Sequence, residues 1–157
     1  MFLLTPVRER RLGIRRSIAV LFGAAALVGV AVAPASAGSG VSPCRSACDG
    51  QDPSSYVHYG QTCAADAQTI DTHYVQGRTV QLRYSNRCET SWARVYGADF
   101  PDVIRVQNID TYQIQNRELR QGEHEAWTPM VDDSGSRSKA CWWVGWATNN
   151  NECTSAY

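Results

Sequence analysis

The sequence predicts an all-β fold, a small disulfide-stapled antiparallel β-sandwich or open barrel. Short runs of residues alternate between apolar and polar side chains, which is the period of a half-buried strand. Turn-forming residues separate these runs at short intervals, and helical periodicity is almost absent. The chain also contains six cysteines, enough to staple a small domain. Short strands with short links favour a sandwich or barrel.

The stretch Val80–Arg94 carries the clearest strand pattern. Its first half alternates apolar and polar side chains, which predicts a strand over residues 78–85. A turn and Cys88 follow, and a second strand is expected over residues 91–96 with Trp92 as a large buried side chain. We expect this pair of strands to be the structural centre of the domain.

Four further strands are predicted, over residues 103–108, 111–115, 124–130 and 140–146. The first two form a tight hairpin, and a charged loop follows over residues 117–123. Residues 44–63 read as an irregular loop shaped by disulfides, and residues 64–74 fit either a helical turn or an extended segment. The expected core is Val80, Leu82, Tyr84, Trp92, Ile104, Val106, Ile114, Met130 and Val144.

The first 37 residues have the features of a cleavable signal peptide. Residues 8–16 are basic, residues 18–32 are apolar, and Ala35-Ser36-Ala37 matches the small-x-small site of signal peptidase. The alternative, an uncleaved anchor, is weaker because the apolar run is shorter than the roughly 20 residues that span a bilayer. We therefore expect a secreted, extracellular protein without a stable membrane anchor, although Sec and twin-arginine export both stay open.

After cleavage, residues 38–43 form a disordered lead-in and residues 44–157 a single disulfide-rich domain. Five of the 15 basic residues and one of the 15 acidic residues belong to the signal peptide. The secreted chain then has 10 basic and 14 acidic groups, a net charge near −4. No basic stripe is present, which argues against nucleic acid as a partner.

All six cysteines follow the signal peptide, and an even count in an exported chain predicts three disulfides. They are Cys44, Cys48, Cys63, Cys88, Cys141 and Cys153. Fifteen pairings are possible. If Trp146 and Asn151 flank a short turn, Cys141 lies out of register with Cys153, and a direct bridge needs a longer loop. No Cys-x-x-Cys occurs and the three histidines are scattered, so no metal or cofactor is expected.

Several short blocks resemble one family. They are Cys44-x3-Cys48 with Gly50 and Asp52-Pro53, Cys63-Ala-Ala-Asp66-Ala67, Leu82-Arg83-Tyr84-Ser85 with Cys88, Trp92-Ala93-Arg94, Met130-Val131 and Ala140-Cys141. In this order they resemble the small exported domains of Gram-positive bacteria classed as domain of unknown function 2690, which includes YjfA-like proteins. The resemblance implies an exported, disulfide-bonded domain and no particular activity.

No catalytic residue is predicted. Asp71-x-His73 and Glu123-His124-Glu125 are the places where a base lies beside a carboxylate, and neither has a nucleophile motif. On a strand, Glu123 and Glu125 would point away from His124. Solvent-facing polar residues are the simpler interpretation, so a small hydrolase is the least favoured function.

Two sets of side chains are candidate ligand contacts. Arg83 and Arg94 either stack on aromatic neighbours such as Tyr84 and Trp92 or clamp an anionic ligand. The second set is Trp142, Trp143 and Trp146, which either fill the core or leave one or two rings exposed for binding.

The leading function is a secreted, non-enzymatic domain that binds or has a structural role at the cell envelope. Its partner is unknown, and an envelope glycan or protein fits best. The alternative is a cell-wall carbohydrate-binding module that uses the aromatic cluster Trp142–Trp146.

Overall fold

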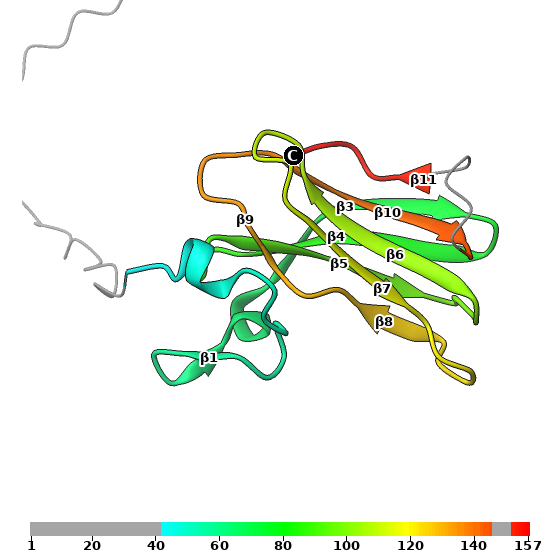
Figure 1. Cartoon of the computed structure of the whole chain (residues 1–157), viewed down its shortest axis with the longest axis horizontal. Coiled ribbons are helices and arrows are strands. Elements are labelled where there is room, and N and C mark those ends of the chain that lie inside the picture. Colours follow the sequence, from blue (N-terminus) through cyan, green and yellow to red (C-terminus); the bar gives the residue numbers. More distant parts are fainter. Residues whose placement is uncertain (1–41, 146–151) are drawn as a thin grey trace, which may run out of the picture. The chain divides into compact units, whose positions relative to one another are not determined.

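The computed structural model describes residues 42–145 and 152–157 (Figure 1). The predicted signal peptide at 1–37, most of the lead-in at 38–43, and Trp146 lie outside the described residues. The described chain is all-β, as the alternating pattern predicted. None of its helices has the length and apolar character needed to cross a membrane.

One antiparallel sheet contains the strand pair that the sequence identified as central. Its strands lie in the order β3-β4-β5-β8, and β9 also pairs with β5. A two-residue turn, Gln76-Gly77, joins β3 to β4, and both of its residues have positive φ, as a tight hairpin turn requires. The bounds are β3 Gln68–Val75, β4 Arg78–Ser85, β5 Thr90–Tyr96, β8 Glu125–Trp127 and β9 Val131–Asp132.

The second antiparallel sheet has the order β11-β10-β6-β7. The predicted hairpin of β6 and β7 is confirmed, but β7 begins later than expected and extends into the segment expected to be a charged loop. The bounds are β6 Asp102–Asn108, β7 Ile114–Glu118, β10 Ser138–Val144 and β11 Glu152–Cys153.

The two sheets pack face to face and enclose the main core (Figure 1). Alternate residues of β4, β5, β6 and β10 point between them, including Val80, Leu82, Ile104, Val106 and Trp142, all at most 1% exposed.

The prediction that Ile114 and Val144 lie in the core is wrong. Ile114 is 41% exposed and Val144 is 50% exposed. Ile114 is the first residue of the edge strand β7 and Val144 is the last of β10, so both lie at strand ends. Alternation predicts the face of a strand but not how far the opposite sheet covers it. Tyr84, also expected in the core, is half-buried.

The segment before β3 is irregular and is built around cysteines, as expected. It comprises η1 Arg45–Cys48, β1 Val57–His58, β2 Gln61–Thr62 and η2 Cys63–Asp66. Residues 64–74, which the sequence left ambiguous, form the end of η2 and then most of β3. Four cysteines of the domain pack with Trp92 and Met130 in a second buried cluster. This cluster lies against the side of β5 that faces away from the main core.

Candidate functional site

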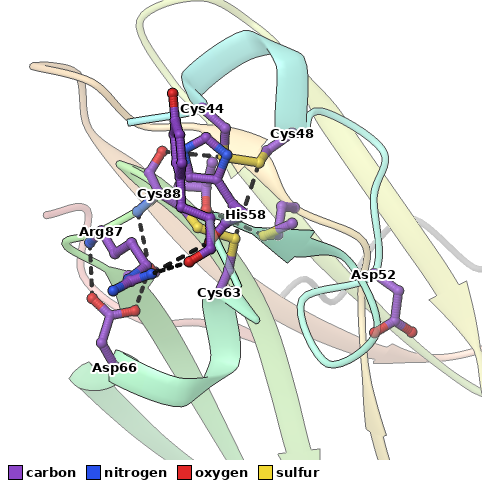
Figure 2. The surroundings of a disulfide bond; sticks show 12 residues. Cys44, Cys48, Asp52, His58, Cys63, Asp66, Arg87 and Cys88 are labelled. Atoms are coloured by element: carbon purple, nitrogen blue, oxygen red, sulfur yellow. Dashed lines mark hydrogen bonds between the residues drawn. A yellow bond between two sulfur atoms is a disulfide. The ribbon is translucent and has the colours of Figure 1, made fainter. Parts of the chain in front are cut away.

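The six cysteines form three disulfides, which join Cys44 to Cys48, Cys63 to Cys88, and Cys141 to Cys153. The first two bridges lie side by side, as Figure 2 shows, with 4.0 Å between the Sγ atoms of Cys48 and Cys63. His58, Asp66 and Arg87 surround them. The Arg87 guanidinium contacts the His58 carbonyl at 3.3 Å, and Asp66 accepts a bond of 2.8 Å from the Arg87 backbone N–H.

These four sulfur atoms all lie within 4.8 Å of one another. A set of four cysteines this close has the composition of a tetrahedral metal site. A metal binds the thiolate, however, and here each sulfur is bonded to another sulfur. In the oxidised form the cluster therefore acts as a covalent staple.

Cys141 and Cys153 stand directly opposite each other in the register of β10 and β11. The sequence left this pairing open, because a short turn flanked by Trp146 and Asn151 would have placed the two cysteines out of register. The direct bridge is present. β10 ends at Val144 and β11 begins at Glu152, and residues 146–151 between them lie outside the described residues.

A pocket of about 360 Å³ lies on the face of the first sheet that points away from the main core. We call it the Arg83 pocket. In the strand register Arg83 is opposite Trp92, and Arg94 is opposite Trp127, so these four side chains share one face across β4, β5 and β8. The full lining is Ser54, Ala64, Arg83, Trp92, Arg94, Glu125 and Trp127. Ser54 and Ala64 come from the disulfide-held segment, so the staple forms one wall of the pocket.

Arg83 is held in the pocket by neutral partners. Its Nη1 donates to the Thr69 hydroxyl at 2.5 Å and its Nη2 donates to the Ala67 carbonyl at 2.9 Å. Within residues 42–145 and 152–157 it has no carboxylate partner. Burial lowers the pKa of Arg83, and the nearby charge of Arg94 lowers it further. Two guanidiniums thus lie close enough to repel each other.

Arg94 is partly neutralised. Its Nε donates to Glu125 Oε1 at 2.8 Å, and its Nη2 donates to the same oxygen. The guanidinium also stacks over Tyr96, 4.5 Å from the ring centroid, rather than over Tyr84 or Trp92. The residues that line the pocket therefore include two arginines and one carboxylate, Glu125.

Trp127 was not among the candidate contacts, although it lines the pocket. Its indole N–H lies 3.3 Å from the Asp52 carboxylate, and the Arg117 guanidinium stacks 5.5 Å from the ring centroid. These contacts fix the half-buried ring. Alternation in the predicted strand 124–130 would have placed Trp127 on the same face as Glu125, but only the register with β5 places it beside Arg94.

The tryptophans of β10 are core residues. Trp142 is 1% exposed and Trp143 is 2% exposed, so neither ring offers a surface for a ligand. Trp142 packs in the main core, and Trp143 packs with Val103 and Cys141 on the opposite face of the second sheet. Of the two alternatives that the sequence left open, Trp142 and Trp143 follow the first: both rings fill the core and neither is exposed for binding. Trp146 lies outside the described residues.

The sequence contains two motifs in which a histidine lies near a carboxylate, Asp71-x-His73 and Glu123-His124-Glu125. In the described part of the chain, neither motif places its histidine next to a nucleophile. His73 contacts Glu152 of β11 at 3.1 Å, while Asp71 accepts a bond from the backbone N–H of Ser155. His124 lies 3.3 Å from the Ala98 carbonyl, and its side chain is exposed. In the described part of the chain, neither histidine contacts a serine or threonine hydroxyl.

A comparison with known families identifies one match. A family model described as a protein of unknown function, DUF2690, matches residues 46–141. This span runs from within η1 into β10 and contains four of the six cysteines and both arginines of the Arg83 pocket. No curated protein and no solved structure matches the chain. The match covers more than half of the sequence, and the chain therefore belongs to the DUF2690 family of proteins of unknown function.

Proposed function

We propose that this protein is a secreted, non-enzymatic binding domain of the cell envelope that holds an anionic group of an envelope glycan in the Arg83 pocket. The likeness to the YjfA-like exported proteins of Gram-positive bacteria is part of this proposal. The signal-peptide pattern and the three disulfides support it, because disulfides persist in oxidising compartments outside the cytoplasm.

The observation that carries the proposal is the environment of Arg83. Its guanidinium lines an open pocket, lies near a second guanidinium, and has no carboxylate partner in the described part of the chain. A bound anion would relieve the repulsion between Arg83 and Arg94. Arginine suits this role because its planar fork donates two parallel hydrogen bonds to a carboxylate or a phosphate.

The aromatic wall of the pocket favours a sugar-bearing anion over a simple ion. The Trp127 ring is held in place by Asp52 and Arg117, and it faces the same pocket as Arg94. An immobilised indole binds a sugar ring with little loss of side-chain entropy. A glycan that carries carboxyl groups, such as peptidoglycan, supplies both a ring and an anion.

The absence of enzymatic activity is also a proposal. It is supported by the contacts of the two histidines: His73 contacts Glu152, His124 contacts the Ala98 carbonyl, and in the described part of the chain neither contacts a serine or threonine hydroxyl. A purified protein that released fragments from peptidoglycan, and lost this activity on His73→Ala or His124→Ala, would contradict it.

Sedimentation with insoluble peptidoglycan tests the proposed binding. The wild-type protein is mixed with native peptidoglycan and with peptidoglycan whose carboxyl groups have been converted to amides. We expect co-sedimentation with the native polymer and a loss of about tenfold or more with the amide form, because a charge-assisted hydrogen bond contributes about 1.5–3 kcal/mol. Equal binding to both polymers, or no binding to either, would overturn the proposal.

A further inference from the structure

A second pocket, of about 270 Å³, lies on the other face of the first sheet, away from the Arg83 pocket. Its floor is apolar and comes from Ile70 of β3 and Leu82 of β4. Two tyrosines, two serines and one carboxylate complete it. The full lining is Ile70, Leu82, Tyr84, Ser91, Asp133, Ser136 and Tyr157.

Asp133 supplies the carboxylate of this pocket. It is 8% exposed, and three serine hydroxyls donate to its carboxylate. Ser138 donates to Oδ1 at 3.0 Å, Ser136 donates to Oδ1 at 3.4 Å, and Ser91 donates to Oδ2. Oδ1 therefore accepts two hydrogen bonds and Oδ2 accepts one. A carboxylate oxygen has two acceptor sites, so one site of Oδ2 is left for a donor from the pocket.

The surroundings of the pocket are negative. Burial raises the pKa of Tyr84 first, and the charges of Glu89, Asp133, Asp66 and Asp132 raise it further. Glu89 is paired with Arg45, but no arginine or lysine lines the pocket. A cation that enters would meet an acceptor without a competing basic side chain.

We propose that this pocket binds a small organic ammonium ion, with the ammonium group on Asp133 Oδ2 and the carbon chain over Ile70 and Leu82. The site is separate from the Arg83 pocket and goes beyond the proposed function. Tyr84 and Tyr157 supply aromatic surface, which attracts a cation as well as covering its apolar part. The volume is below the range of drug-sized sites, so the ligand has only a few carbon atoms.

The position of Tyr157 supports this arrangement. Its backbone exchanges two hydrogen bonds with Ser138, of 2.9 and 3.0 Å, which fix the segment after β11 against β10. The side chain itself is not needed for these bonds, and Tyr157 is 70% exposed. Tyr157→Ala should therefore change the pocket wall without changing the fold.

Nuclear magnetic resonance titration with n-butylammonium and with n-butanol tests the proposal. The two probes have the same carbon chain and differ in charge. We expect wild-type protein to bind the ammonium ion about tenfold or more tightly than the alcohol. Asp133→Asn should abolish this preference, and Tyr157→Ala should weaken ammonium binding by about threefold. Asp110→Asn, which removes an exposed carboxylate elsewhere, should have no effect.

The alcohol comparison and the Tyr157 variant decide the outcome even if Asp133→Asn does not fold. Equal affinity for the two probes would overturn the proposal. The same holds if neither probe binds, if folded Asp133→Asn keeps the preference for the ammonium ion, or if Tyr157→Ala binds the ammonium ion as tightly as the wild type.

Discussion

Arg83 of β4 stands directly opposite Trp92 of β5, and both side chains line one pocket. Trp92 is almost fully buried against two disulfides, whereas the Arg83 guanidinium reaches the pocket. The covalent staple and the candidate binding residue are thus neighbours across a single pair of strands. Two of the three disulfides therefore hold the segment that supplies Ser54 and Ala64 to the pocket wall.

The carboxylate of Glu125 competes with any anion for Arg94. Glu125→Gln should therefore strengthen binding of the carboxylated glycan by about two- to fivefold, a gain of roughly 0.5–1 kcal/mol for removing an exposed ion pair. The measurement is the dissociation constant by isothermal calorimetry. Glu89→Gln is the matched control, because Glu89 pairs with Arg45 and neither residue lines the Arg83 pocket. Weaker binding by Glu125→Gln would mean that the ligand contacts Glu125 itself.

The three disulfides should contribute unequally to stability, in the order of the loops they close. Cys63–Cys88 spans 25 residues, Cys141–Cys153 spans 12, and Cys44–Cys48 spans 4. Loop-closure entropy gives about 3.5, about 2.8 and about 1.9 kcal/mol, respectively. The free energies of unfolding of the three paired Cys→Ala variants, measured by chemical denaturation, test this order. If the Cys44–Cys48 variant instead lost the most free energy of unfolding, packing within the sulfur cluster would outweigh loop-closure entropy.

Two aspartates should give opposite pH dependences of stability. Burial raises the pKa of Asp133, so the folded state binds its proton more tightly and stability falls as pH rises through that pKa. Hydrogen bonds from Arg137 lower the pKa of Asp110, so its contribution is present at neutral pH and is lost as pH falls through the folded-state value.

Denaturation of wild type, Asp133→Asn and Asp110→Asn between about pH 7 and about pH 3 separates the two effects. The stability of wild type relative to Asp133→Asn should increase as pH falls, and the stability relative to Asp110→Asn should decrease. Two differences that change in the same direction would contradict the assigned environments.

The indole N–H groups of Trp142 and Trp143 are buried and have no hydrogen-bond partner within the described residues. Trp143→Phe removes such a donor and keeps a ring near Arg105, so it should cost less than about 1 kcal/mol, whereas Trp143→Ala should cost about 3–5 kcal/mol. Chemical denaturation measures both. The folded Trp143→Ala protein should still bind peptidoglycan like the wild type; a specific loss of binding would restore this ring as a contact.

The sheet containing β4 and β5 was predictable because its signals are local. Alternation in Val80–Tyr84 defines one buried face, and the short turn before Cys88 forces the next strand to pair beside it. Both strands were found close to their predicted bounds. The same local rule also placed Trp142 and Trp143 on opposite faces of β10. It could not show that both faces are covered, which depends on packing from distant segments.

The candidate site was only half predictable for a similar reason. Arg83 and Arg94 lie in one hairpin, and their residue types identified them. Trp127 reaches the same pocket through the pairing of β5 with β8, across a long stretch of sequence. Asp133 has two of its serine partners, Ser136 and Ser138, nearby in the sequence, but Ser91 reaches it through the pairing of β5 with β9. Pairings of this range depend on tertiary packing rather than on local pattern.

The role of Arg83 in anion binding is tested most directly by comparing Arg83→Gln with Arg137→Gln in binding to a soluble carboxylated peptidoglycan fragment, by isothermal calorimetry. Each change removes one positive charge, but Arg137 is exposed and paired with Asp110 rather than lining the Arg83 pocket. We expect a loss of about tenfold or more in affinity for Arg83→Gln and a change of less than about twofold for Arg137→Gln. Equal effects of the two substitutions, in folded proteins, would contradict this role.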